Sequence, residues 1–249
     1  FPSPEASYKR SPYLLWLTTS QDEVIPAFFI DVGAKYTLLF SHGNAEDLGH
    51  AIERARLLSP ILGVNIFAYE YTGYGLSTGA ASEEATYADI EAAFQYLTAV
   101  LGVPWSSIIL YGWSLGSGPS VHLASRLPVR GVVLHSAFAS VYRCASSLLA
   151  ALPGDAYPNV ERIGAVRCPI YIVHGVDDFI TPVWHAHELA ASCRAESAYP
   201  PLLVEDAGHH DVEVVAGPIF VDGFLKFLGW LDARPAAVLG TEEVEERKH

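Results

Sequence analysis

Hydrophobic and polar positions follow two different periods along this chain. Short apolar runs recur between longer stretches in which apolar residues repeat at helical spacing. The short runs predict strands at 13–17, 24–29, 36–40, 65–69, 108–111, 129–135, 170–174 and 201–205. The longer stretches predict helices at 48–58, 82–101, 121–125, 144–152, 184–192 and 219–231.

This alternation predicts parallel strands covered by helices on both faces, as in a doubly wound, mostly parallel α/β sheet. The first two runs are separated by a polar turn and predict a hairpin of edge strands. No internal repeat and no linker is visible, so we expect one domain over residues 11–235. We expect an extended lead-in over 1–10, a short lid or insert within 136–166 and an acidic tail over 236–249.

Composition narrows the class of protein. The chain has 249 residues, of which 51% are hydrophobic, and it can bury a large core. A net charge of −13 argues against a nucleic-acid partner and leaves no basic patch for anionic lipid. No apolar run reaches membrane-spanning length, and no signal peptide is visible. Because methionine is absent even at the first position, we expect a fragment or a sequence that has lost its methionines.

Metal and cofactor signals are weak. The three cysteines are odd in number and include no C-x-x-C pair, which favours free thiols in a reducing compartment. His185 and His187 lie two residues apart on a predicted helix and cannot share a face. Gly73 and Gly75 lack the rest of a dinucleotide-binding motif and predict a turn. We therefore expect no metal and no cofactor.

The strongest chemical signal is the segment Gly112-Trp113-Ser114-Leu115-Gly116. It joins a buried strand to a helix and has the G-x-S-x-G spacing of a nucleophile elbow. The flanking glycines let strand and helix pass closely, so that a strained Ser114 can expose its hydroxyl. A glycine-rich turn that only packs is the alternative. The segment predicts Ser114 as a nucleophile.

An acid and a histidine follow later strands, where the functional groups of open α/β sheets lie. Asp177 and Asp178 follow the strand at 170–174, and His209 and His210 follow the last strand. The chain order Ser, Asp, His is that of α/β hydrolases, in which histidine is the base and the acid orients it. We favour Asp178 and His209, although spacing leaves Asp177 and His210 open. Asp206 and Asp211 are interpreted as loop and capping acids.

The remaining site predictions concern the oxyanion hole and the residues around it. We expect the oxyanion hole to be formed by two backbone N–H groups. One belongs to Leu115, the residue after the nucleophile, and the other to Asn44, in the loop after the strand at 36–40. Trp113 is a possible pocket wall. His42 is interpreted as a structural hydrogen-bonding residue beneath this loop. Because position 135 is a histidine, we do not expect the catalytic acid on that strand.

Several motifs together resemble the α/β-hydrolase domain-containing protein 17 family over about 36–228. The similar segments are Ser-His-Gly-Asn-Ala-Glu-Asp-Leu-Gly at 41–49, Asn-Ile-Phe-Ala-Tyr-Glu-Tyr-Thr-Gly-Tyr-Gly at 65–75, Tyr-Ala-Asp-Ile at 87–90, Ser-Ile-Ile-Leu-Tyr-Gly at 107–112, Leu-Ala-Ser-Arg at 123–126, Leu-His-Ser at 134–136 and Ala-Gly-His with Asp at 207–211. Two departures concern substrate choice: Trp113 stands where the family usually has Gln, and Glu70 stands where it usually has Asp.

The resemblance implies a serine hydrolase that removes palmitoyl groups from cysteines of membrane-attached proteins. It places the nucleophile at Ser114, the acid at Asp178 and the base at His209. It further implies a location on the cytoplasmic side of membranes, through an acylated cysteine-rich segment that is not part of this sequence. The alternatives are a lipid or small-ester hydrolase, such as a lysophospholipase or carboxylesterase, and a non-catalytic scaffold.

Overall fold

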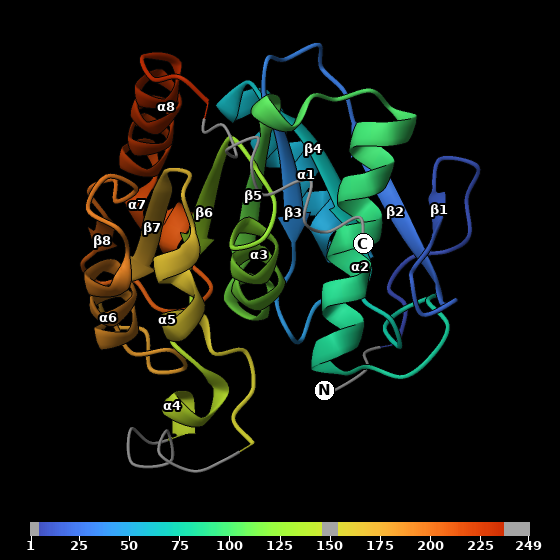
Figure 1. Cartoon of the computed structure of the whole chain (residues 1–249), viewed down its shortest axis with the longest axis horizontal. Coiled ribbons are helices and arrows are strands. Elements are labelled where there is room, and N and C mark those ends of the chain that lie inside the picture. The colour runs from blue at the N-terminus through green and yellow to red at the C-terminus, as the bar shows by residue number, and fades with distance from the viewer. Residues whose placement is uncertain (1–4, 146–153, 237–249) are drawn as a thin grey trace, which may run out of the picture.

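The computed structural model describes residues 5–145 and 154–236. Within them, eight strands form a single sheet in the order β1-β2-β4-β3-β5-β6-β7-β8 (Figure 1). The strands are β1 Leu15–Thr18, β2 Val24–Ile30, β3 Thr37–Ser41, β4 Asn65–Tyr69, β5 Ile108–Trp113, β6 Gly131–His135, β7 Ile170–Gly175 and β8 Leu202–Val204. β2 runs antiparallel to both of its neighbours, and all other pairs are parallel. The predicted mostly parallel α/β sheet is confirmed, with the hairpin β1–β2 at one edge.

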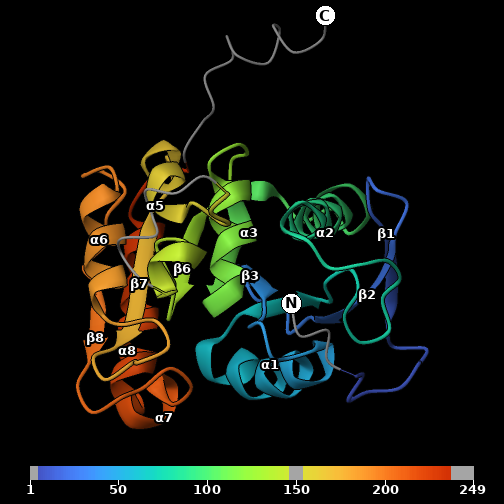
Figure 2. The same cartoon turned by 90° about the horizontal axis from the view of Figure 1, so that it is seen from below.

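Helices cover both faces of this sheet. They are α1 Leu48–Leu62, α2 Glu83–Gln95, α3 Ser117–Ala124, α4 Val141–Ala145, α5 Asn159–Arg162, α6 Trp184–Ser192, α7 Val212–Ala216 and α8 Pro218–Asp232. Figure 2 shows α2, α3 and α6 on one side of the sheet and α1, α7 and α8 on the other. Because β3, β5, β6, β7 and β8 are parallel neighbours, their carboxyl ends lie at the same end of the sheet. The loops that follow these strands therefore meet there.

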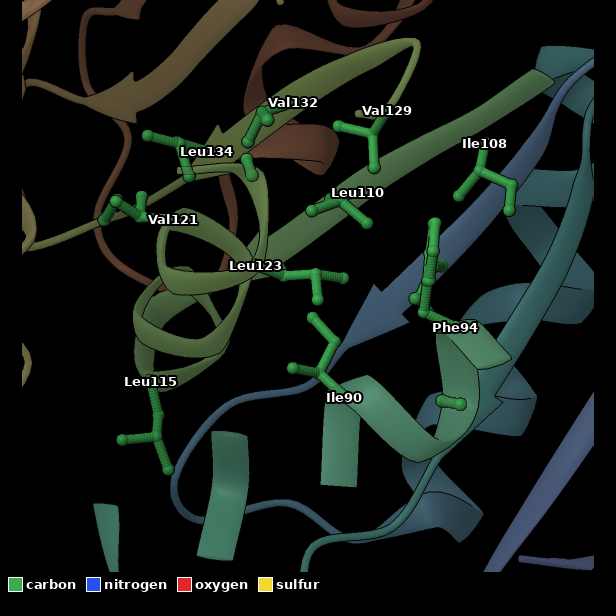
Figure 3. Packing of buried hydrophobic residues seen from close by; sticks show 14 of the residues in the cluster. Ile90, Phe94, Ile108, Leu110, Leu115, Val121, Leu123, Val129, Val132 and Leu134 are labelled. Carbon is green, nitrogen blue, oxygen red and sulfur yellow. The ribbon is translucent and has the colours of Figure 1, made fainter. Parts of the chain in front are cut away.

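The strands divide their side chains between two hydrophobic clusters, because successive residues of a strand point to opposite faces. In β5, Ile108 and Leu110 join the cluster under α2, α3 and α6, whereas Ile109 and Tyr111 join the cluster under α1 and α8. Figure 3 shows the first cluster, with Leu110 beside residues from α2 and α3. Burial on both faces explains why the central strands are almost continuously apolar.

Two predicted helices differ clearly from the structure, and a third cannot be compared with it. The predicted helix at 82–101 is α-helical only to Gln95, and Tyr96–Val100 forms a wider π-helical turn. Within this turn Thr98 donates its hydroxyl to the carbonyl of Phe94, a local bond that competes with regular helix pairing. α1 continues beyond the predicted end, through Pro60, to Leu62. The predicted helix at 144–152 lies mostly outside the described residues.

Parts of three predicted segments also lie outside them: residues 1–4 of the lead-in, 146–153 of the insert and 237–249 of the acidic tail. Within the described ranges, none of the helices combines the length and apolar character needed to cross a bilayer.

Candidate active site

The turn between β5 and α3 holds Ser114 in a strained backbone conformation. Its φ is 51°, in the left-handed region that non-glycine residues rarely occupy. A Cβ on Gly112 would lie 2.5 Å from the carbonyl oxygen of Gly116. A Cβ on Gly116 would lie 2.0 Å from the carbonyl oxygen of Ser41 in β3. Both contacts are too short, so the backbone crossing needs glycine at 112 and 116.

Ser114, His209 and Asp178 form one hydrogen-bond chain, although they come from three different loops. The Oγ of Ser114 lies 2.9 Å from Nε2 of His209. Nδ1 of the same imidazole lies 2.7 Å from Oδ2 of Asp178. His209 is 6% exposed and Asp178 is 3% exposed, so the chain is largely shielded from water. This geometry can remove a proton from the serine hydroxyl while the carboxylate stabilises the imidazolium.

Thr181 completes the environment of the Asp178 carboxylate. Its hydroxyl donates to Oδ2 over 2.7 Å, and its backbone N–H donates to Oδ1 over 2.8 Å. Burial favours the neutral carboxyl, but the hydrogen bonds from His209 and Thr181 outweigh it and hold the pKa of Asp178 below its usual value. Asp178 is therefore ionised at neutral pH. Sequence reasoning missed Thr181. The available signal was Asp178 itself, because an aspartate in a turn often accepts the backbone N–H two residues on, as Asp178 does from Ile180 over 2.9 Å.

The acids and the histidine next to Asp178 and His209 in sequence do not join this hydrogen-bond chain. Asp177 and His210 are both exposed. The ring of His210 packs edge-on against Trp113, with centroids 5.6 Å apart. Asp211 accepts a hydrogen bond from the backbone N–H of Gly208 over 2.7 Å and so tightens the turn before His209. Asp206 is an exposed turn residue with a φ of 59°.

A buried histidine and glutamate lie beneath the loop that follows β3. Nε2 of His42 lies 3.0 Å from Oε1 of Glu70, and both side chains are fully buried. Nδ1 of His42 faces the carbonyl of Gly43 over 2.9 Å. Burial lowers the pKa of His42, but the Glu70 carboxylate outweighs this effect and raises it above its usual value. We associated Glu70 with substrate choice, whereas its fully buried side chain pairs with His42 beneath the loop. Its place directly after β4 was the signal for this role.

Ser114, Leu115 and Asn44 meet at a cavity of about 320 Å³. The other described residues that line it are Phe138, Val141, Cys144, Ala156, Tyr157, Ile180 and Thr181. Tyr74 donates a hydrogen bond from its hydroxyl to Oδ1 of Asn44 over 2.8 Å, which orients that side chain at the cavity. The hydroxyl of Ser114 therefore faces a mostly apolar cavity, with the two predicted oxyanion residues in its lining.

Trp113 does not line the described part of this cavity, contrary to our expectation of a pocket wall. Its side chain packs in the same hydrophobic cluster as Ile109 and Tyr111, on the face of the sheet covered by α1 and α8, and is 2% exposed. The guanidinium of Arg54 lies 4.2 Å from the centroid of its ring. The ring of His209 lies on another side, at 6.1 Å between centroids. Trp113 thus supports the site from behind.

Other polar residues near the site do not join this chain. His135, at the end of β6, is buried with Nδ1 2.8 Å from the Tyr111 hydroxyl. Burial lowers the pKa of His135 to about 4, so the imidazole is neutral. The three cysteines are free, and Cys144 lies at the cavity. Within residues 5–145 and 154–236, no group of three or more His, Cys, Asp or Glu side chains is placed to hold a metal.

Comparison with known proteins defines the class. Residues 36–162 match the family described as the alpha/beta hydrolase fold. An esterase of Pyrococcus furiosus shares the fold with a TM-score of 0.73 at 16% identity, covering 91% of this chain and 98% of that one. The protein is an α/β hydrolase by fold.

Two curated relatives define the family more narrowly. Alpha/beta hydrolase domain-containing protein aho-3 of Caenorhabditis elegans is 44% identical over 188 residues, which are 73% of this chain and 54% of that protein. Human alpha/beta hydrolase domain-containing protein 17B is 41% identical over 199 residues, 79% of this chain and 68% of that protein. The chain belongs to the α/β-hydrolase domain-containing protein 17 family. It spans between half and two thirds of the length of relatives such as aho-3.

Proposed function

We propose that this protein is a serine hydrolase that cleaves acyl esters and thioesters and removes long-chain acyl groups, such as palmitoyl, from cysteines of S-acylated proteins. The observation that carries the proposal is the hydrogen-bond chain from Ser114 through His209 to Asp178. It ends at a hydroxyl that faces a mostly apolar cavity.

In the proposed reaction, Nε2 of His209 takes the hydroxyl proton as Oγ of Ser114 attacks the acyl carbonyl carbon. The N–H groups of Asn44 and Leu115 donate to the oxyanion that forms. The C–S or C–O bond then breaks, and His209 returns the proton to the leaving thiol or alcohol. Water, deprotonated by His209, attacks the acyl-enzyme and releases the fatty acid with Ser114 restored.

Apolar side chains at the mouth of the cavity support a long acyl chain as the substrate group. Val141 is 40% exposed and Ile180 is 49% exposed, and both line the cavity. Phe179, next to Asp178 in sequence, is 89% exposed. An acyl chain attached to a protein must enter from the surface, and Val141 and Ile180 offer it apolar contact at the cavity. A thiol is also a good leaving group, so little protonation by His209 is required.

The test is fluorophosphonate labelling of the full chain and of Ser114→Ala, together with turnover of a palmitoyl thioester, a lysophospholipid and a short p-nitrophenyl ester. We expect labelling and thioester turnover that both disappear in Ser114→Ala. Labelling with turnover only of the lysophospholipid or the short ester would assign a lipid or small-ester hydrolase. An unlabelled wild-type chain would assign a non-catalytic scaffold.

Neighbouring residues provide matched controls for the other two positions. Asp178→Asn should lower kcat by roughly 10³–10⁴, because the amide favours the wrong imidazole tautomer. Asp177→Asn makes the same chemical change at an exposed position and should retain activity. His209→Ala and His210→Ala form the second pair, with loss expected only for His209. Equal effects within either pair would contradict the assignment of that residue.

A further inference from the structure

The N-terminal strap, residues 7–8, lies across the beginning of α1. The hydroxyl of Ser7 donates to Oδ1 of Asp47 over 2.6 Å, and its backbone N–H donates to Oδ2 over 2.5 Å. Asp47 is the N-cap of α1 and accepts the backbone N–H of His50. The strap is thus tied to the residue that begins α1, directly after the loop that carries Asn44.

Tyr8 contacts the buried carboxylate behind that loop. Its hydroxyl donates to Oε2 of Glu70 over 2.9 Å. The same oxygen accepts the backbone N–H of Leu48 over 2.8 Å, while Oε1 faces Nε2 of His42. Glu70 is fully buried, so these donors take the place of water around its charge. Removing one of them leaves the carboxylate freer to move.

Two glycines in the body of the domain leave room for the strap. A Cβ on Gly49 would lie 2.1 Å from Oγ of Ser7. A Cβ on Gly75 would lie 2.4 Å from Oε2 of Glu70 and 2.8 Å from the hydroxyl of Tyr8. All three distances are below any ordinary contact, so a side chain at either position would displace an anchor of the strap. These close approaches support the docked strap independently of its hydrogen bonds.

Glu70 holds both ends of the loop between β3 and α1. It binds His42 at the start of the loop and Leu48 at its end, and Asn44 lies between them. We propose that Tyr8 is a positioning residue: by holding Glu70, it keeps the Asn44 N–H where the oxyanion forms. This inference rests on the proposed serine-hydrolase function, because it assigns Tyr8 a role in that same reaction.

The test compares the wild-type full chain with Tyr8→Phe, which removes only the hydroxyl. Active sites are counted by fluorophosphonate titration, and ester hydrolysis is expressed per titrated site. We expect kcat per site to fall about tenfold with KM within about twofold, less than the full loss of an oxyanion donor. The Ki of a trifluoromethyl ketone transition-state analogue should rise by the same factor as kcat/KM falls.

Tyr13→Phe is the matched control, because Tyr13 is close in sequence and 79% exposed. It should match the wild type in every readout. Ser7→Ala, which removes one of the two bonds to Asp47, should lower kcat in the same direction by a smaller factor. Thermal unfolding of each variant shows whether it is folded.

Two results would overturn the inference. One is an unchanged kcat per titrated site in Tyr8→Phe. The other is a loss confined to the number of titratable sites or to Tm, which would make Tyr8 merely structural. A wild-type chain that neither labels nor hydrolyses esters would instead refute the proposed function, and the role of Tyr8 with it. This failure is distinguishable because it is seen in the unsubstituted chain.

Discussion

The two sides of Ser114 are held in place by different physical means. On the elbow side, the backbone crossing at Gly112 and Gly116 leaves no room for a Cβ, so steric exclusion sets the position of Ser114, the proposed nucleophile. On the side of Asn44, the buried pair of His42 and Glu70 holds the loop through hydrogen bonds and charge. Steric exclusion is independent of pH, whereas a buried ion pair responds to protonation. We therefore expect substitutions at the elbow to cause a large loss of stability. Substitutions at the loop should cause smaller losses that depend on pH.

The largest effect is expected for Gly116→Ala. The new Cβ would lie 2.0 Å from the carbonyl oxygen of Ser41, and neither backbone segment can yield without disturbing β3 or β5. The free energy of unfolding, measured by urea titration, should fall by more than about 4 kcal/mol. Gly229→Ala in α8 is the control, since nothing lies within 4 Å of its added Cβ. It should stabilise by roughly 0.5–1 kcal/mol. A tolerated Gly116→Ala would show that the elbow is not sterically fixed.

The next effect is expected for Glu70→Gln, which keeps the shape of the side chain but removes its charge. His42 would lose its ionic partner inside the protein, and the free energy of unfolding should fall by roughly 2–4 kcal/mol. Ester hydrolysis should fall as well, because the loop around Asn44 loses its support. Glu53→Gln is the surface control: its side chain is 73% exposed, it pairs with Arg56, and it should cost less than about 0.5 kcal/mol. Equal costs would mean that the buried pair does not hold the loop.

The pH dependence of stability should separate two buried histidines by sign. His42 has a raised pKa, so its contribution is complete below the ordinary value of 6.5 and is lost as the pH rises through the raised value. His135 has a pKa lowered to about 4, so its contribution is present above 6.5 and is lost as the pH falls toward 4. By pH 5 the loss from His135 should be on the order of 1–2 kcal/mol.

Urea titrations from pH 4.5 to 8.5 would measure both limbs of the stability profile: the acid limb below pH 6.5, assigned to His135, and the limb above pH 6.5, assigned to His42. His135→Gln should flatten the acid limb, and Glu70→Gln should flatten the limb above pH 6.5. If His135→Gln leaves the acid limb unchanged, burial of this imidazole does not control it.

The smallest effect is expected for Tyr74→Phe. The substitution removes the hydroxyl that donates to Oδ1 of Asn44 over 2.8 Å. The free energy of unfolding should fall by about 1 kcal/mol, the usual net value of one hydrogen bond. Hydrolysis per titrated site should fall a few-fold, because the two ends of the loop that carries Asn44 are still held by the bonds of Glu70 to His42 and Leu48. A loss as large as that of Glu70→Gln would shift the main support of the loop from the carboxylate to Tyr74.

Hydrophobic periodicity predicted most of the sheet because burial on both faces makes the central strands apolar over their whole length. The runs around Leu39, Phe67 and Leu110 are examples. The end of α2 was less predictable, because the bond from the Thr98 hydroxyl to Phe94 is a local competition that leaves no periodic trace. The short helices α5 and α7 were missed because four or five residues carry too little periodicity to detect.

Trp113 illustrates an error that strand geometry could have prevented. Its side chain follows the two-residue period of Ile109 and Tyr111, so it points to the face of α1 and not toward the cavity. Trp113 directly precedes Ser114 in sequence, and the alternation along the strand therefore turns the two side chains to opposite sides. The alternation of side chains along β5 is sufficient by itself to assign Trp113 to the core.

Local chemistry along the chain was sufficient to specify the parallel sheet, the glycine-flanked serine and the order of serine, acid and histidine. Spacing could not choose between Asp177 and Asp178, since neighbouring residues differ only in which way the folded loop turns them. Tyr8 and Glu70 lie 62 positions apart, and only packing makes them neighbours. Hydrophobic period and turn chemistry are local properties of the chain, whereas side-chain orientation and buried charge pairing depend on elements that meet after folding.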